Sequence, residues 1–336
     1  MGLAAECITT IYLASTCLQR SPKFVRSMTS SREHPPAAAG AKCPIVLACD
    51  ENYAMPLATT LRSLVEANAR HWPLQVTVLT DGLAERTKGL VAASLPPGSV
   101  SLTWRLIDVS RFAHLSLMSH VSRMTFARFE IEHAFGGDVK RVVYLDTDTL
   151  VLGDLGPLFE VDLGAHVLAA VADDHIDAAI RAGDSRRLKG VPDLVNYFNA
   201  GVLLIELSNW RRFEISQRAI LHLQAHPHLP YSDQDALNAV CASNWLPLES
   251  KWNHQDHFAT RIEDIPPDKR PAIVHFITAR KPWLTKSVSP NRDLYNRFKE
   301  RTKFSAGLLE RMHSSITFSY YSLIAKYTKR KPWIEE

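Results

Sequence analysis

The sequence predicts an α/β fold, and three observations support this prediction. Short apolar runs rich in β-branched residues recur along the chain, and stretches with helical spacing of apolar residues alternate with them. Several of these runs end in an acidic residue. The chain has 336 residues, of which 46% are hydrophobic and 22% charged, which is the composition of a globular protein. This length permits one large α/β domain or two smaller ones.

The first predicted unit is a strand, a turn and a helix. Residues 44–50 form an apolar run that ends in Asp50, and Asn52 follows in a turn. Leu57 and Leu61 then recur at helical spacing. Ligands of open α/β sheets bind beyond the carboxyl ends of strands, so Asp50 and Asn52 are candidates for contacts to a nucleotide. For Asp50, a role as turn former or as helix N-terminal charge is an equal alternative.

Further strands and helices are expected in alternation along the rest of the chain. Apolar runs that predict strands lie at residues 75–80, 102–106, 141–145, 167–172, 197–205 and 271–276. Helical spacing predicts helices at residues 122–135 and 210–226 and another helix from Ser232. Polar residues at the ends of these elements supply the candidate functional groups.

Two carboxylates, Asp146 and Asp148, directly follow the strand at residues 141–145. In extended backbone, residues two positions apart point the same way. Like charges on one face after a buried strand repel each other and are costly to desolvate. A divalent cation removes this cost by taking both as oxygen ligands. An Asp-x-Asp pair alone is more often a polar strand end; the apolar strand before it and the polar clusters downstream favour a metal site.

Polar side chains near two other strands suit the binding of sugar hydroxyls. Asp173 ends the run at residues 167–172, and a carboxylate accepts hydrogen bonds from hydroxyl groups. Asn199 offers a donor and an acceptor together, and Gly201 lets a ligand or backbone approach closely. The structural alternatives are helix capping or a solvated turn for Asp173, and a β-bulge with a capping asparagine for the other two.

The helix that begins near Ser232 carries a cluster of acids and amides. Ser232 is expected to be its N-cap, with Asp235 at the capping-box position. This structural role does not account for Asp233 and Gln234, which would project at the mouth of the helix.

Three basic or titratable residues are candidates to complete a charged site. Arg128 could reach a phosphate or pair with a carboxylate near the metal, and the alternative is a solvated helix arginine. His275, at the end of the last strand, could complete the metal site, although a lone histidine is more often a satisfied core residue. Lys281 could contact a phosphate as a point charge, and the alternative is a solvated loop lysine.

Net charge, cysteine content and apolar runs indicate the kinds of partner and the compartment that suit this chain. The net charge of +4 and the isoelectric point near 8.8 fit acidic partners such as nucleotide diphosphates or an anionic membrane surface. The five cysteines include no C-x-x-C motif and are odd in number, which disfavours a metal cluster and a disulfide framework and predicts a reducing compartment. No membrane-spanning helix and no signal peptide are expected, because long apolar runs and a basic leader are absent from the sequence.

The two ends of the chain differ in composition from the middle. Residues 1–43 are expected to be a flexible lead-in, since their second half is rich in Ser, Pro, Ala and Arg. Residues 286–336 are basic and aromatic, which suits an anionic membrane surface; a solvated helical extension is an equal alternative. The expected location is the cytoplasm, with peripheral contact on the inner face of the cytoplasmic membrane.

Together these segments resemble glycosyltransferase family 8, the retaining hexosyltransferases that use nucleotide-diphosphate sugars, and within it bacterial lipopolysaccharide α-galactosyltransferases. The residues that carry the resemblance lie at 48–52, 125–128, 144–151, 197–205, 232–238 and 275–283. It implies a GT-A type fold, with a Rossmann-like, mixed and mostly parallel sheet flanked by helices. The catalytic domain would span residues 44–285, with a basic helical C-terminal extension after it.

The resemblance also implies a role for each candidate site residue. Mn²⁺, with Mg²⁺ as the alternative, would be held by Asp146, Asp148 and His275. The UDP-hexose donor would be contacted by Ala48, Asp50, Asn52, Arg128, Asp146, Thr147, Asp148, Asn199, Gly201, Asp233, Gln234, Thr278 and Lys281. The acceptor would face Asp173 and Gln234, and the catalytic residues would be Asp233, Gln234 and Asp235. Thr278 is a departure, because similar proteins carry Gly there, near the diphosphate.

The expected reaction is transfer of galactose or glucose from a UDP-sugar to a glycan or glycolipid acceptor, such as lipopolysaccharide, lipooligosaccharide or another cell-surface glycan. No nucleic-acid partner is expected. Retention by front-face attack and retention through a covalent intermediate both remain open; for the latter Gln234 is a poor nucleophile and Asp235 a candidate. Two alternative functions are a catalytically silent sugar-nucleotide-binding protein on the same fold and a UDP-sugar hydrolase.

Overall fold

The computed structural model describes residues 43–115, 122–181, 196–242, 244–257, 260–284 and 287–305. The expected lead-in, apart from its last residue, and the C-terminal segment after residue 305 lie outside this part of the chain. No helix among the described residues combines the length and apolar character needed to cross a membrane.

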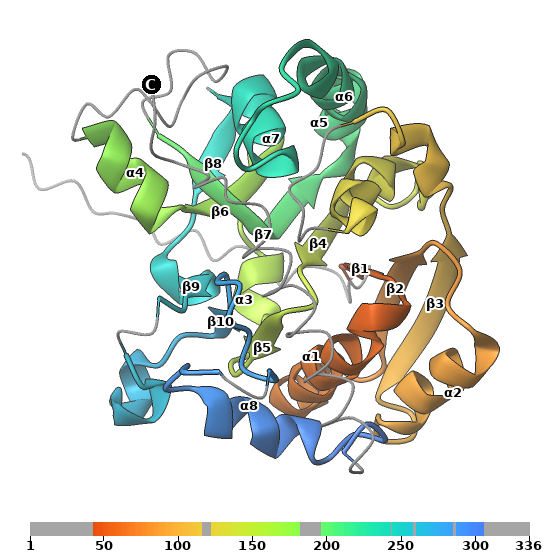
Figure 1. Cartoon of the computed structure of the whole chain (residues 1–336), viewed down its shortest axis with the longest axis vertical. Coiled ribbons are helices and arrows are strands. Elements are labelled where there is room, and N and C mark those ends of the chain that lie inside the picture. The colour runs from red at the N-terminus through yellow and green to blue at the C-terminus, as the bar shows by residue number, and fades with distance from the viewer. Residues whose placement is uncertain are drawn as a thin grey trace, which may run out of the picture. The chain divides into compact units, whose positions relative to one another are not determined.

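The α/β prediction is confirmed by a seven-stranded mixed sheet, in the order β3-β2-β1-β4-β7-β6-β8 (Figure 1). Neighbouring strands are parallel except around β7, which is antiparallel to both β4 and β6. The strands are β1 Ile45–Cys49, β2 Leu74–Thr80, β3 Val100–Leu106, β4 Arg141–Leu145, β6 Leu168–Ala172, β7 Phe198–Glu206 and β8 Trp245–Pro247. The sheet is therefore mixed and mostly parallel, as the family resemblance implied.

A second, three-stranded sheet brings residues 254–275 to the Asp-x-Asp loop. It contains β5 (Thr149–Val151), β10 (Ile273–His275) and β9 (His254–Gln255), with β10 in the middle. Strand β10 is antiparallel to β5, and the register places His275 opposite Thr149. This pairing carries a residue from late in the sequence to the point where the two aspartates lie.

The described residues form eight α-helices, and two of the predicted helices differ from the structure. The α-helices are α1 Ala54–Ala67, α2 Glu85–Ala93, α3 Gly156–Phe159, α4 Asp174–Arg181, α5 Leu207–Arg212, α6 Ile215–Ala225, α7 Asp233–Cys241 and α8 Arg292–Lys299. The single helix predicted at residues 210–226 is wrong, because Glu214 adopts a left-handed conformation with φ of 50° and separates α5 from α6. The helix predicted at 122–135 is instead a 3-10 helix over Arg123–His133.

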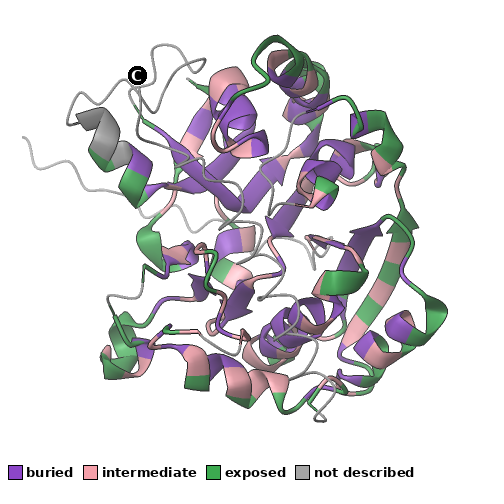
Figure 2. Cartoon of the chain, viewed as in Figure 1, coloured by how far each residue is buried: buried purple, intermediate pink, exposed green. Residues whose placement is uncertain are grey.

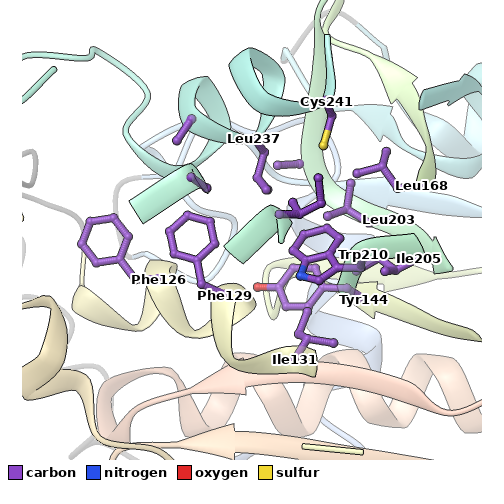
Figure 3. Close-up of a cluster of buried hydrophobic side chains, with 14 of the residues drawn as sticks. Phe126, Phe129, Ile131, Tyr144, Leu168, Leu203, Ile205, Trp210, Leu237 and Cys241 are labelled. Atoms are coloured by element: carbon purple, nitrogen blue, oxygen red, sulfur yellow. The ribbon is translucent and has the colours of Figure 1, made fainter. Parts of the chain in front are cut away.

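Alternate residues of the central strands pack into separate apolar clusters. In β4, Val142 and Tyr144 belong to one cluster, whereas Val143 and Leu145 belong to the other. Figure 3 shows the first cluster, in which Tyr144 of β4 lies among side chains from β6, β7 and the helices. Figure 2 shows the same contrast at the scale of the sheet, since the central strands are buried and β3 alternates with exposed positions.

Helix α8 packs against the rest of the fold. Tyr295 is fully buried and stacks edge-on against Phe276, the residue that follows β10. Trp283 also lies beside Tyr295, with ring centroids 5.2 Å apart. The start of the predicted C-terminal segment, up to residue 305, is thus packed onto the expected catalytic domain.

The antiparallel insertion of β7 determines which residues meet at one edge of the sheet. Because β7 runs opposite to β4, its first residues lie beside the residues that follow β4. The backbone N–H of Asp146 donates to the carbonyl of Gly201 at 2.8 Å. The polar start of β7 and the acidic end of β4 therefore share one site.

Candidate active site

Asp146, Asp148 and His275 converge at this edge of the sheet. One ligand atom from each lies within 4.8 Å of the others, and the described residues contain no other cluster of this kind. The Nε2 atom of His275 is 3.2 Å from Asp148 Oδ1 and 3.8 Å from Asp146 Oδ2. Two carboxylates and an imidazole at this separation could together hold a divalent cation.

One feature of the site fits such a cation. The Oδ1 atom of Asp148 is buried, and among the described residues no donor meets it in hydrogen-bond geometry. The Nε2 atom of His275 lies near enough, at 3.2 Å, but not in alignment for a hydrogen bond. A buried carboxylate oxygen without a donor is costly, and a cation is the ligand that would satisfy it.

Gly201 makes the convergence of His275 and Asp146 sterically feasible. A Cβ atom built on Gly201 would lie 2.1 Å from Cε1 of His275 and 2.9 Å from Oδ2 of Asp146. Such a contact is impossible without displacing the ring. The expected close approach at Gly201 is thus made by the side chains of the candidate metal site.

Lys281 provides a positive charge at the same place. Its Nζ atom is 2.6 Å from Asp148 Oδ2 and donates to the carbonyl of Phe276, also at 2.6 Å. Burial alone would raise the pKa of Asp148, but Lys281 and then His275 in its protonated form outweigh it, so the pKa lies below its ordinary value. Asp148 is therefore ionised and able to act as a ligand at neutral pH.

Arg128 is buried, with 4% of its surface exposed, and bridges two acids. Its guanidinium is 2.9 Å from Asp146 Oδ1 and 3.0 Å from Asp233 Oδ2. The alternative of a solvated helix arginine is wrong, because the 3-10 helix turns this side chain inward. Arg128 thereby links the Asp-x-Asp loop to the start of α7.

Tyr144 holds Asp146 in place through a hydrogen bond. Its hydroxyl donates to Asp146 Oδ1 at 2.7 Å. Burial raises the pKa of Tyr144 well above its ordinary value, so the hydroxyl keeps its proton and remains a donor. The sequence analysis used Tyr144 only as an apolar strand residue. Its spacing of two residues from Asp146 in extended backbone is the local signal that could have indicated this contact.

Asp233 is fixed by Arg128 and by Thr125, whose hydroxyl donates to Asp233 Oδ1 at 2.6 Å. Burial raises the pKa of Asp233, while Arg128 and Thr125 oppose this effect. The carboxylate lies at the start of α7, where the helix dipole also favours a negative charge.

Asp173, Asn199 and Gln234 form a hydrogen-bonded cluster next to this site. The Oδ2 atom of Asp173 accepts from Asn199 Nδ2 at 3.1 Å and from Gln234 Nε2 at 3.2 Å. The Oε1 atom of Gln234 accepts from the backbone N–H of Ala200 at 3.0 Å. Residues predicted from three separate elements thus meet in one place.

Asp235 lies deeper, with 1% of its surface exposed. It accepts from the Tyr197 hydroxyl at 2.6 Å and from the backbone N–H of Tyr231 at 2.7 Å. Burial raises its pKa to about 6, and these two hydrogen bonds oppose the shift. The predicted capping box is wrong, because Ser232 has φ of 47°, outside the extended conformation usual for an N-cap, and its side chain makes no capping hydrogen bond.

The remaining candidates lie around the same edge of the sheet. Asp50 caps the 3-10 turn Glu51–Tyr53 by accepting from the backbone N–H of Tyr53, which is its predicted structural alternative, and it also accepts from Ser122 Oγ at 2.6 Å. Asn52 is exposed in that turn. Three further candidates are Ala48 in β1, Thr147 between the aspartates and Thr278 after β10.

The fold is of the GT-A type, as its match to a solved glycosyltransferase shows. The fold matches a crystal structure of the galactosyltransferase LgtC in complex with donor and acceptor sugar analogues, with a TM-score of 0.68 and 27% identity. That match covers 81% of this chain and 99% of LgtC. The model of the family "Glycosyl transferase family 8" matches residues 44–287, and the chain belongs to this family.

Two curated relatives cover similar parts of the chain. General stress protein A of Bacillus subtilis (strain 168) is 29% identical, over 78% of this chain and 94% of its own length. The lipopolysaccharide 1,3-galactosyltransferase of Salmonella typhimurium is 26% identical, over 79% of this chain and 80% of its own length.

Proposed function

We propose that this protein is a metal-dependent retaining hexosyltransferase that moves galactose or glucose from a UDP-sugar to a cell-surface glycan such as lipopolysaccharide or lipooligosaccharide. The observation that carries the proposal is the convergence of Asp146, Asp148 and His275, with Lys281 beside them, at the ligand-binding edge of a family 8 fold. Relatives named as lipopolysaccharide galactosyl- and glucosyltransferases support the substrate class.

Asp146, Asp148 and His275 would hold Mn²⁺, or Mg²⁺ in its place. When bound, the divalent ion supplies Lewis-acid stabilisation of the negative charge that develops on the departing diphosphate. Lys281 adds a protein cation at the same place, since its ammonium group already lies beside Asp148 and carries three donors. Arg128 and Tyr144 hold Asp146 in a fixed orientation by bonding the same oxygen.

The donor sugar and acceptor would lie over the cluster that contains Asp173, Asn199 and Gln234. A carboxylate with two amides presents donors and acceptors together, which is what vicinal sugar hydroxyls require. Asp233, held by Arg128, would contact the same sugar. Ala48, Asp50 and Asn52, at the end of β1, would contact the uridine.

We assign retention to front-face attack. Both oxygens of Asp235 already accept hydrogen bonds, and the amide of Gln234 is held by Ala200 and Asp173, so neither is oriented as a free nucleophile. The bond between the anomeric carbon and the phosphate oxygen breaks as the acceptor hydroxyl attacks from the same face. The departing phosphate oxygen takes the proton of that hydroxyl.

The test is UDP release with UDP-galactose, UDP-glucose and a panel of other UDP-sugars, each with Mn²⁺ and with or without added glycan. The proposal expects release that depends on Mn²⁺ and on the acceptor, with one hexose preferred. Release without acceptor at the same rate would identify a hydrolase. Binding of UDP-sugar without release would identify a silent binding protein.

The basic C-terminal segment would bring the enzyme to a glycolipid acceptor at the inner face of the cytoplasmic membrane. Basic and aromatic residues recur beyond residue 305, including Lys329, Arg330, Lys331 and Trp333. Because α8 packs onto the catalytic domain, the informative truncation ends at Ser305. The truncated protein should no longer float with anionic liposomes. Flotation equal to that of the full chain would contradict this role.

A further inference from the structure

A buried chain of amide groups runs from His275 to Asp173. The Nδ1 atom of His275 is 3.1 Å from Asn253 Oδ1, and Asn253 Nδ2 is 2.9 Å from Asn199 Oδ1. Asn199 Nδ2 in turn is 3.1 Å from Asp173 Oδ2. All four side chains are buried, and Asn253 has 1% of its surface exposed.

The direction of this chain is set by two groups whose roles are unambiguous. The backbone N–H of Gly201 can only donate, and it lies 3.1 Å from the oxygen of the Asn199 amide. The carboxylate of Asp173 accepts from the nitrogen of the same amide. Asn199 therefore presents its oxygen, and not its nitrogen, to Asn253.

Asn253 must then donate to Asn199 through Nδ2, which leaves its oxygen facing His275. An amide oxygen only accepts, so the Nδ1 atom of His275 carries the proton in this contact. In the neutral imidazole, the other nitrogen, Nε2, then has no proton and presents a lone pair. That nitrogen faces Asp148 Oδ1 and Asp146 Oδ2.

We propose that Asn253 is a positioning residue that holds His275 in the Nδ1–H tautomer and so presents Nε2 as a ligand atom beside the two aspartates. Asn253 also bonds Asn199, and it thereby connects the orientation of His275 to the cluster of Asp173, Asn199 and Gln234. Two acceptors that face each other at 3.2 Å, Nε2 and Asp148 Oδ1, explain why this oxygen lacks a donor. The identity of the bound ion rests on the proposed function, whereas the tautomer does not.

The tautomer is measured directly in the metal-free protein. Protein labelled with ¹⁵N-histidine is examined by long-range ¹H–¹⁵N correlation spectra, and the His275 signals are assigned as those lost in His275→Gln. The spectra are followed upward in pH until the ring is neutral. Wild type should show a protonated Nδ1 and an unprotonated Nε2; a protonated Nε2, or an equal mixture, would overturn the proposal.

Variants of Asn253 distinguish the role of its side-chain oxygen as a hydrogen-bond acceptor from its contribution to packing. Asn253→Ala should lose the single tautomer and bind Mn²⁺ about 10–100-fold more weakly, measured by electron paramagnetic resonance of free Mn²⁺. Asn253→Asp keeps an acceptor toward Nδ1–H and should keep the tautomer. Asn68→Ala is the matched control, because Asn68 is an equally buried asparagine that bonds Leu64, Gly153 and Leu155 instead.

If Asn253→Ala kept the His275 tautomer and the Mn²⁺ affinity of the wild type, the proposal would be overturned. Asn68→Ala should leave both readouts unchanged, so that an equal loss in this control would assign the effect to stability and also overturn it. A protein that shows the expected tautomer but no sugar transfer would instead refute the proposed function alone. The two failures are therefore distinguishable.

Discussion

Two polar clusters at the same edge of the sheet differ in how their buried carboxylates are paired. We call Asp146, Asp148, His275 and Lys281 the cation cluster, and Asp173, Asn199, Gln234 and Asp235 the amide cluster. In the amide cluster, Asp235 and Asp173 are met by hydroxyl, amide or backbone donors. In the cation cluster, acceptors face each other and a carboxylate oxygen of Asp148 has no aligned donor among the described residues.

The difference indicates which cluster is completed by a ligand. In the cation cluster, Asp148 Oδ1 lacks a donor, and a cation that joins this oxygen to the neighbouring ligand atoms would remove the cost of burying it. A set in which donors and acceptors already match is rigid before any ligand arrives, and such preorganisation is what a binding platform needs. Arg128 connects the two, because it pairs with Asp146 on one side and with Asp233 at the start of α7 on the other.

Removal of this connection should have the largest effect on stability. Arg128→Met leaves Asp146 and Asp233 without their buried cation and should lower the free energy of unfolding by about 3–5 kcal/mol. Urea denaturation measures the change. Arg211→Met is the control, because Arg211 donates to the backbone carbonyls of Glu132 and Phe135, and we expect a loss of about 1–2 kcal/mol. Equal losses in the two variants would contradict a bridging role.

Loss of a carboxylate from the cation cluster should nearly abolish transfer. Asp146→Asn or Asp148→Asn should reduce kcat/KM on the order of 10²–10³-fold, because charge stabilisation on the leaving group is lost. UDP release measures the rate. Asp154→Asn should retain activity, since Asp154 pairs with Arg70 and His71 away from the site. Full activity of either cluster variant, or of wild type in EDTA, would remove the metal role.

A methyl group at position 201 should damage the cation cluster without removing any ligand. Gly201→Ala places Cβ where the His275 ring lies, and we expect Mn²⁺ affinity to fall about 10–100-fold. Titration of Mn²⁺ by electron paramagnetic resonance measures the change. Gly89→Ala, in α2, is the control, because no atom lies within 4 Å of the added Cβ. Unaltered affinity in Gly201→Ala would show that the ring does not need this space.

The amide cluster should contribute a smaller, pH-dependent effect. The pKa of Asp235 is raised from 3.8 to about 6, so between these values the folded protein holds a proton that the unfolded chain has released. The free energy of unfolding should therefore fall as pH rises through this window, by roughly 2 kcal/mol. Asp235→Asn cannot titrate and should lack this fall. Denaturation of both proteins from about pH 4 to 7 measures the difference, and parallel profiles would contradict it.

Local patterns in the sequence were sufficient for the longer strands and for the Asp-x-Asp pair, but not for the short strands β5, β8 and β9. The apolar runs around β1, β2, β4, β7 and β10 are recognisable because a buried strand needs consecutive apolar residues. The two aspartates follow such a run, and their chemistry depends only on their spacing. The break at Glu214 and the missing cap at Ser232 were not predictable, because a positive φ is uncommon at non-glycine residues and no local pattern signals it.

The sequence by itself determined which residues could be charged or form hydrogen bonds, because residue type and local periodicity depend only on nearby positions. Only the tertiary structure decided which of them meet. Asn253 reaches His275 and Asn199, and His275 reaches Asp148, through contacts that depend on strand register and on the antiparallel insertion of β7. Such contacts join residues far apart in the chain or on turns of irregular backbone, where no repeating pattern records the partner.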